Sequence, residues 1–251
     1  MNDLINNIKN LREITGAGFL DCKKALEQNN NDLETSVDFL RKKGLAKANK
    51  KSSREAKEGA VGIYSNDKIT SILQINTETD FAAKNEIFLN FMDMIGEFSL
   101  KIDDLTCKIE DFNNMEFSGS TIQNHFKEII SKIGENILLS NFIFIQKNKN
   151  ELISYYIHNN YRKNIGKIAV TLKANTESLN DEVKIFAKNL CMHIAASKPL
   201  AMSIDQLDKE LVKKEKEVQL DTIKSSGKPD NIIDKILEGK MKKFFSENTF
   251  L

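Results

Sequence analysis

The chain of 251 residues contains no tryptophan, two prolines and three cysteines. Three cysteines without a CxxC spacing argue against a disulfide framework or a cysteine-based zinc site, and they favour a reducing compartment. No apolar run approaches the roughly 20 residues that a membrane-spanning helix needs. The N-terminal segment, MNDLINNIKNL, lacks the apolar core of a secretory signal. We therefore expect a cytoplasmic protein that makes no membrane contact.

The chain also lacks the usual patterns of a catalytic or cofactor site. It has no GxxxxGK phosphate-binding motif, and the glycines of TGAG at 15–18 lie between two expected helices, the wrong context for a dinucleotide. The three histidines, His125, His158 and His193, show no metal-ligand spacing. Cys22 is conceivable as a nucleophile, but a small buried hydrophobe is the simpler interpretation. We expect no cofactor, no metal, and a binding protein rather than an enzyme.

The N-terminal part of the chain reads as a small helical bundle. Hydrophobic residues make up 40% of the chain and charged residues 29%, as in globular proteins. Apolar residues recur at helical spacing in three short segments, separated by TGAG and by a polar turn at 29–32. Gly44 is expected to end the third helix. The sequence therefore predicts a three-helix domain over 1–44.

A basic segment, 45–59, follows this bundle. It carries almost no large apolar group, and its cations are Lys47, Lys50, Lys51, Arg54 and Lys57. We interpret it as a solvated linker that is helical in part. The alternative is a contact with an anionic partner.

The next stretch, 60–145, has the pattern of an α+β unit. Two strand-like runs, 60–65 and 69–76, are joined by a polar pair typical of a hairpin. A single long helix is expected after Thr79, with apolar residues at helical spacing: Phe81, Phe88, Phe91, Met92, Ile95 and Phe98. Residues 102–120 look irregular. A helix closed by Gly134 and a strand over 136–145 complete the unit.

A second unit repeats the order strand, strand, helix, which indicates an internal structural duplication. Its strands are expected at 151–158 and 165–172, separated by a polar turn at 159–160, and its helix stops before Pro199. Two antiparallel helices over 203–243, joined by SSGKP, then form a hairpin. The predicted domains are 1–44, 45–59, 60–145, 146–200 with 244–251, and the hairpin at 201–243.

Residues 77–85, TETDFAAKN, form the most informative segment. Thr and Asp are good helix-starting residues because their side-chain oxygens accept hydrogen bonds from first-turn amides. Phe81 stands beside Asp80 at this tip, and such a pair can enter another protein as an apolar wedge next to a carboxylate. The alternative is a core position, because Phe81 shares helical register with Phe88 and Ile95. A buried Asp80 would, however, need partners.

Several motifs together resemble the bacterial elongation factor Ts family over almost the whole chain. They are LREITGAGFLDCKKAL at 11–26, TDFAAKN at 79–85, KIGENI at 132–137, MHIAASKP at 192–199, QLDTIKSSGKP at 219–229 and EGKMKKFF at 238–245. Their shared order and spacing carry the resemblance. It implies an α+β fold with a three-helix ubiquitin-associated-like (UBA-like) domain, a linker, a two-part core of duplicated sheet-and-helix units, and an inserted antiparallel coiled-coil hairpin.

The resemblance also implies a function: guanine-nucleotide exchange on elongation factor Tu, achieved by binding. In the family, the Asp and Phe of the TDF motif approach the magnesium site of the GTPase and dislocate the ion. On this chain these residues are Asp80 and Phe81, followed by Ala82 and Ala83 in the same partner-binding motif. Ala82 stands where the family usually has Val, so we expect a thinner apolar neighbour for the wedge and a weaker contact.

Other partner contacts follow from the same resemblance. Arg12, Phe19 and Leu20 match positions that touch a helix of the GTP-binding domain, and His158 matches a histidine that faces a second domain of elongation factor Tu. Arg12 alone would read as a solvated helix charge, and His158 as a strand-end histidine with a local hydrogen bond. Phe19 and Leu20 are adjacent on a short helix and cannot both face one narrow core, so one should be exposed.

Two further classes of function compete with exchange. Residues 45–57 could bind nucleic acid or the ribosome, although the net charge of +1 and the lack of a stacking aromatic there argue against it. The hairpin could mediate a homodimer or a 2:2 complex, which is compatible with exchange. Family members usually continue past the position of Leu251 with a core strand and a helical module. A chain ending there is expected to lack that strand and one partner contact.

Overall fold

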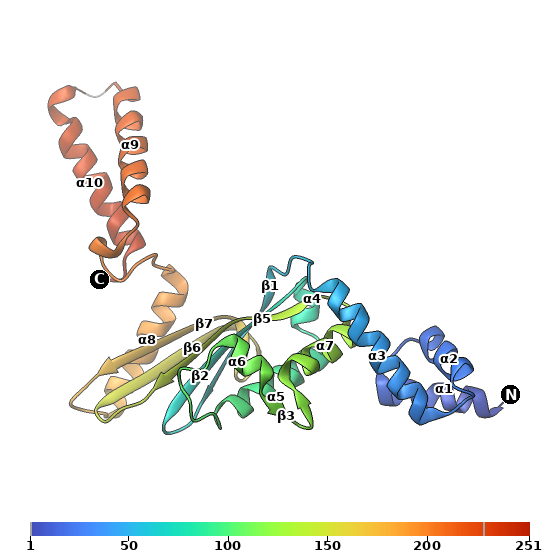
Figure 1. The fold of residues 1–251 in the computed structure, drawn as a ribbon. Coiled ribbons are helices and arrows are strands. Elements are labelled where there is room, and N and C mark those ends of the chain that lie inside the picture. The colour runs from blue at the N-terminus through green and yellow to red at the C-terminus, as the bar shows by residue number, and fades with distance from the viewer. Residues whose placement is uncertain (1, 228) are drawn as a thin grey trace. The chain divides into compact units, whose positions relative to one another are not determined.

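The computed structural model describes residues 2–227 and 229–251 and divides into two compact units (Figure 1). The first comprises Met1–Ile153 with Ile157–Ala169, and the second comprises Ser154–Tyr156 with Val170–Leu251. Two residues of the sequence predictions fall outside this description: Lys228 in the SSGKP break, and the side chain of Lys47 in the basic segment.

The N-terminal helices form their own small core in the first unit. They are α1 (Asn2–Thr15), α2 (Phe19–Gln28) and α3 (Leu33–Lys51), as the apolar spacing predicts. Asp32 begins α3, because its carboxylate accepts the Thr35 backbone N–H at 2.8 Å. The buried residues of this cluster are Ile8, Leu11, Cys22, Ala25, Leu26 and Leu40. Cys22 is 0% exposed and burial raises the pKa of its thiol, as expected of a small buried hydrophobe.

The predicted helix end at Gly44 is wrong, because α3 continues to Lys51. Gly44 lies where α3 packs on α7 (Ile122–Ile133), and a Cβ at this position would come within 2.5 Å of the Ser131 Oγ. The missing side chain thus permits a close helix–helix approach and does not mark a helix end. The first part of the predicted 45–59 linker is consequently helical.

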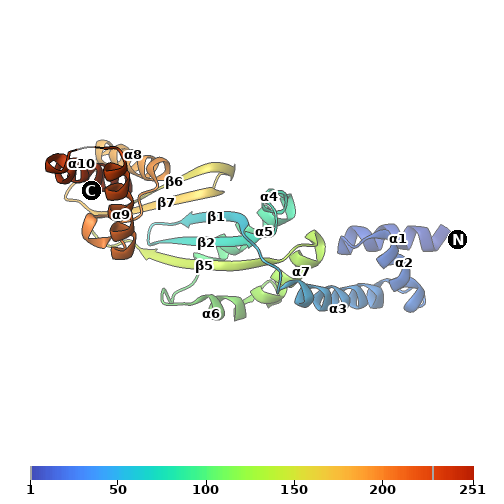
Figure 2. The ribbon, with the colours of Figure 1, turned by 90° about the horizontal axis from the view of Figure 1, so that it is seen from above.

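The described residues contain a five-stranded sheet with the order β5-β2-β1-β7-β6 (Figure 2). Its strands are β1 (Glu58–Ser65), β2 (Ile69–Thr77), β5 (Ile137–Gln146), β6 (Glu151–Arg162) and β7 (Ile165–Asn175). The β1–β2 hairpin is confirmed: β1 pairs antiparallel with β2 from Glu58↔Thr77 to Ser65↔Thr70. In the turn, the Asn66 Oδ1 accepts the backbone N–H groups of Lys68 and Ile69.

The predicted turn at 159–160 is wrong, because β6 continues to Arg162 and the chain reverses at 163–164. Asn159 has a φ of 53° inside the strand. Asparagine tolerates this left-handed conformation better than most residues, so the polar pair deflects the strand without ending it.

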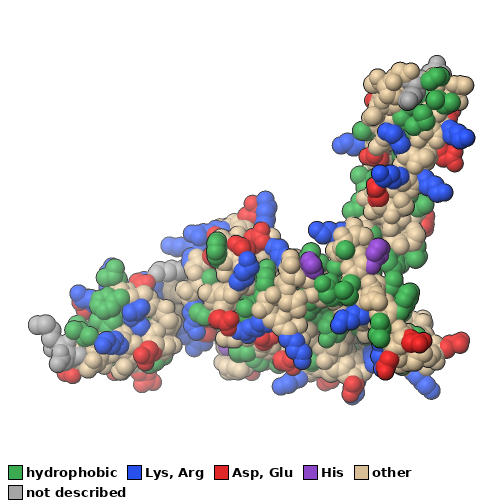
Figure 3. Space-filling view, turned by 180° about the vertical axis from the view of Figure 1, so that it is seen from behind, with side chains coloured by type: hydrophobic (Ala, Val, Ile, Leu, Met, Phe, Trp, Pro, Cys, Tyr) green, Lys and Arg blue, Asp and Glu red, His purple; other side chains and the backbone are tan. Residues whose placement is uncertain are grey.

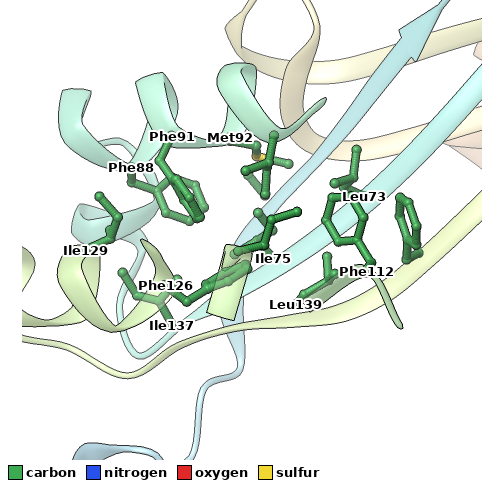
Figure 4. Packing of buried hydrophobic residues seen from close by; sticks show 14 of the residues in the cluster. Leu73, Ile75, Phe88, Phe91, Met92, Phe112, Phe126, Ile129, Ile137 and Leu139 are labelled. Carbon is green, nitrogen blue, oxygen red and sulfur yellow. The ribbon is translucent and has the colours of Figure 1, made fainter. Parts of the chain in front are cut away.

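The main hydrophobic core lies between the sheet and helices α5 (Glu86–Ser99) and α7. Figure 4 shows Phe88, Phe91 and Met92 of α5 pointing toward Leu73 and Ile75 of β2. Phe91 meets Phe126 of α7 edge to face, with ring centroids 4.8 Å apart. The stretch 102–120, expected to be irregular, contains short elements: α6 (Ile109–Asn114), β3 (Glu116–Phe117) and β4 (Ser120–Thr121).

The second unit is mainly helical. It holds α8 (Asp181–Ser197), the short 3₁₀ helix η1 (Ile204–Gln206), α9 (Lys209–Ser225) and α10 (Asp230–Asn248). The predicted helical hairpin is present: α9 and α10 pack through a cluster of Ile223, Ile233, Leu237 and Met241. On α8, Phe186 is 64% exposed, and the smaller residues Ala187, Cys191 and Ala195 are buried instead. The fold is α+β, as predicted.

None of the helices, in the part of the chain that the structure describes, is long and apolar enough to cross a membrane.

Candidate protein interface

The TDFAAKN segment folds as a separate turn of helix, α4 (Asp80–Ala83), between β2 and α5 (Figure 1). The prediction of a single long helix after Thr79 is therefore wrong. Asn85 breaks it, because its side-chain oxygen accepts the Ile87 backbone N–H at 2.9 Å and caps α5 as a new helix. Phe81 thus leaves the register of Phe88 and Ile95, on which its core interpretation depended.

Phe81 is the most exposed large hydrophobic side chain among the described residues, at 82%. The core interpretation of Phe81 is wrong. Its two successors point the other way: Ala82 is 4% and Ala83 0% exposed, and α4 packs against β1 and β2. Ala82 therefore contacts the interior of the first unit rather than lying beside Phe81 on the surface. The two alanines anchor the turn that presents Phe81.

Asp80 is partnered within the same turn. Its carboxylate accepts a hydrogen bond from the Lys84 Nζ at 2.8 Å, at i,i+4 spacing. This hydrogen bond is the main reason that the pKa of Asp80 is lowered and that of Lys84 is raised. The pair is exposed and adds little to folding stability. Asp80 is ionised at neutral pH with or without this contact, which holds the carboxylate in place beside Phe81.

Thr79, the N-cap of α4, fixes how the turn leaves the sheet. Its Oγ1 accepts the Ala82 backbone N–H at 3.3 Å, as the Thr-Asp sequence predicts. Its carbonyl accepts the Thr77 hydroxyl at 2.7 Å. Its own N–H and hydroxyl donate to the Glu135 carboxylate at 2.9 and 2.6 Å. The hydrogen-bonding groups of Thr79 are therefore engaged on all sides.

The remaining predicted contact residues lie elsewhere. Arg12 on α1 and His158 on β6 are exposed. Phe19 and Leu20 begin α2 and are 48% and 70% exposed, so both of them, and not only one, face solvent. Arg12, Phe19 and Leu20 lie on helices α1 and α2, whose hydrophobic cluster is separate from the one beneath α4.

Sequence reasoning missed two residues that hold this turn. Lys84 could have been found, because a Lys four residues after an Asp is a recognisable helical pair. Glu135 could not, because it lies 56 residues from Thr79 and only the pairing of β2 with β5 brings them together.

Within the described residues, no group of three or more His, Cys, Asp or Glu side chains could hold a metal ion. The prominent feature is instead an exposed apolar side chain beside a carboxylate, on a turn that other residues anchor. An exposed aromatic side chain of this size can act as an anchor in a pocket of a partner protein. The fold and the site thus define the class: an α+β protein with a candidate protein-binding tip.

Comparison with known proteins places the chain more narrowly. Residues 78–251 match the family model described as Elongation factor TS. A curated relative named Elongation factor Ts from Bartonella quintana (strain Toulouse) is 38% identical over 246 residues, covering 97% of this chain and 79% of the relative. Relatives of the same name from Brucella anthropi and Rhizobium meliloti (strain 1021) are each 36% identical over 244 residues, with the same coverage. The chain belongs to the elongation factor Ts family, a family of translation elongation factors, which confirms the resemblance seen in its motifs.

Proposed function

We propose that this protein binds the GDP form of elongation factor Tu and promotes GDP release, so that GTP can take its place. The observation that carries this proposal is Phe81, which is 82% exposed on an anchored turn beside an ionised Asp80. Membership of the elongation factor Ts family supports the choice of partner. The protein acts by binding and catalyses no covalent step of its own.

The mechanism follows from the two side chains. Phe81 enters an apolar gap in the GTP-binding domain of the partner, and burying a side chain of this size yields about 1.5–3 kcal/mol. Asp80 brings a negative charge to the magnesium site. Magnesium bridges the nucleotide phosphates and neutralises their charge, so disturbing its coordination weakens the attachment of GDP. Ala82 and Ala83 support the turn from below.

Linkage sets a condition on this mechanism. If the factor lowers the affinity of the partner for nucleotide, nucleotide must lower the affinity of the partner for the factor by the same ratio. GTP therefore displaces the factor as the factor displaces GDP.

The predicted contact residues away from α4 contribute to the affinity for elongation factor Tu more than to the rate of GDP release. The N-terminal helices act as the UBA-like domain of the family and present Arg12, Phe19 and Leu20 to a helix of the GTP-binding domain, while His158 faces a second domain. The exposure of Phe19 and Leu20 supports a contact there, since burying an exposed apolar side chain is favourable. Leu20→Ala should therefore raise the factor concentration needed for half-maximal release and leave the maximal rate unchanged.

The deciding experiment is stopped-flow release of fluorescent GDP from elongation factor Tu, with and without this protein. Substoichiometric protein should accelerate release of all bound GDP, because each molecule dissociates and acts again. Raising the magnesium concentration should reduce the acceleration. A GDP release rate that is the same with and without the protein would overturn the proposal.

Binding of nucleic acid through the basic segment has weaker support. Lys51 donates to the Gly134 carbonyl at 2.6 Å, and Arg54 lies 3.5 Å from the Glu78 carboxylate, so both cations have partners within the fold. On the face shown in Figure 3, basic and acidic side chains are interspersed. Phosphate binding would appear as an affinity that falls steeply with salt.

We also infer that the α9–α10 hairpin acts as an antiparallel coiled coil that joins two copies of the chain. Leu211 and Val218 lie seven residues apart on α9, hence on one helix face, and are 38% and 51% exposed. Light scattering should give a mass near twice the monomer value at micromolar concentration, and Val218→Glu should return it to the monomer value. A monomer at all concentrations would contradict this inference.

A further inference from the structure

A reciprocal pair of glutamates closes the sheet immediately beneath the exposed turn. The last rung of the β2–β5 ladder is Thr77↔Ile137. Just beyond it, Glu78 accepts the Asn136 backbone N–H at 2.6 Å, and Glu135 accepts the Thr79 backbone N–H at 2.9 Å. Each glutamate thus takes the N–H of the residue that follows the other glutamate. The side chains replace the backbone rung that the departing strands can no longer form.

Glu135 also accepts a hydrogen bond from a side chain, the hydroxyl of Thr79. Its Oε1 accepts the Thr79 hydroxyl at 2.6 Å, while its Oε2 holds the Thr79 N–H. A hydroxyl has one proton, so pointing it at Glu135 leaves the Thr79 oxygen lone pairs for the Ala82 N–H at 3.3 Å. One carboxylate therefore fixes both the backbone and the side chain of the residue that starts α4.

The turn depends on this anchoring because it cannot order itself. It spans four residues, Asp80–Ala83, whereas isolated helices shorter than about 12 residues are marginal in water. Phe81, at 82% exposure, receives almost no packing from its own protein. Its direction is set by the backbone of α4, which rests on the two buried alanines beneath and on the Glu135–Thr79 contact at its start.

We propose that Glu135 is a positioning residue for Phe81: it holds the α4 turn in the orientation in which Phe81 enters the partner. The role rests on the proposed exchange function. A side chain that is already oriented enters its pocket without first losing conformational freedom, so more of its burial free energy is available to distort the nucleotide site. Glu135 does not touch the partner in this role and acts through Thr79.

The first experiment needs no partner. Hydrogen exchange of the 79–83 amides should be at least about tenfold faster in Glu135→Ala than in the unaltered protein, since a charge-assisted hydrogen bond of this kind contributes enough to shift local opening by that factor. Glu110→Ala removes an exposed carboxylate on α6 in the same unit and should leave these amides unchanged. Unaltered exchange at 79–83 in Glu135→Ala would refute the anchoring role.

The second experiment measures GDP release from elongation factor Tu at increasing factor concentration. Glu135→Ala should lower the maximal release rate about tenfold, with little change in the half-saturating concentration, because the other contact surfaces are intact. Glu135→Gln retains an acceptor oxygen and should recover part of the rate. In a Phe81→Ala background, Glu135→Ala should have no further effect, because two residues that act through one contact are not additive.

The outcomes separate this proposal from the function on which it rests. If the unaltered protein fails to accelerate GDP release, the exchange function is wrong and the positioning role falls with it. If the unaltered protein is active and Glu135→Ala releases GDP equally fast, only the positioning role is wrong. A purely structural role of Glu135 predicts a different result: a lower melting temperature, but a normal maximal release rate in the fraction of Glu135→Ala that is folded. That result would refute the positioning role.

Discussion

Replacing Phe81 by alanine separates folding from function more cleanly than any other change in this chain. The side chain is 82% exposed and follows a helix start that is capped by other residues. Surface substitutions away from caps and packed positions change the free energy of unfolding by about 0.5 kcal/mol or less. Phe81→Ala should therefore unfold at the same urea midpoint as the unaltered protein, and its helices and sheet should be unchanged by circular dichroism.

The effect on nucleotide release should be much larger. Burial of a phenylalanine side chain in a partner yields about 1.5–3 kcal/mol, which corresponds to roughly a 10- to 150-fold change in rate if the contact forms only as GDP leaves. The loss should appear in the maximal rate at saturating factor. If it appears only in the concentration needed for saturation, Phe81 contributes to binding but does not dislocate the nucleotide.

The assay is stopped-flow release of fluorescent GDP from elongation factor Tu over a range of factor concentrations. Phe186→Ala is the matched control, because it removes the same side chain from another exposed position, 64% exposed on α8 in the second unit. Phe186→Ala should retain the unaltered rate. If the unaltered protein accelerates release, equal rates for folded Phe81→Ala and Phe186→Ala would refute the wedge.

Three further predictions concern stability and charge. A Cβ on Gly96 would lie 2.1 Å from the ring of Tyr64. Gly96→Ala should therefore lower the free energy of unfolding in urea by about 1–3 kcal/mol. Gly239→Ala is the control and should not lower it, because a Cβ there meets nothing within 4 Å. Burial raises the pKa of Tyr64 above its ordinary value of 10.0. The contribution of Tyr64 to stability should therefore be constant below that pH and fall above it by about 1.4 kcal/mol per pH unit, and Tyr64→Phe should reduce that slope in alkaline melts. Lys84→Gln should return the pKa of Asp80 toward 3.8 in a carboxyl NMR titration, because the Lys84 hydrogen bond is the main cause of its lowering; an unchanged Asp80 titration would contradict that assignment.

The local features of this fold could be predicted because their causes are local. The β1–β2 hairpin is determined by Asn66, whose side chain satisfies the turn that follows it. The end of α7 is determined by Gly134, which has a φ of 91° that few other residues adopt. The start of α4 is determined by Thr79. In each case one side chain, or the lack of one, acts on backbone groups within three or four residues.

The errors occurred where a residue type has two uses and the choice depends on a distant segment. Gly44 can end a helix or let two helices approach, and the decision rests with Ser131 on α7. Asn159 can make a turn or kink a strand. The anchoring of Thr79 by Glu135 has no local signal, because strand pairing alone brings together residues 56 positions apart.

The break between α4 and α5 changes how Ala82 should be understood. In one continuous helix, the residue after Phe81 would lie on the flank of the wedge, and a smaller residue there would weaken the contact. In the observed turn Ala82 is 4% exposed and faces the interior of its own unit. The small size of Ala82 thus affects how the turn is supported and leaves the surface around Phe81 as it is. The start of the turn is held separately, because the Glu135 carboxylate accepts hydrogen bonds from both donors of Thr79. The orientation of Phe81 therefore depends on hydrogen bonding at Thr79 as well as on the packing of Ala82 against its own unit.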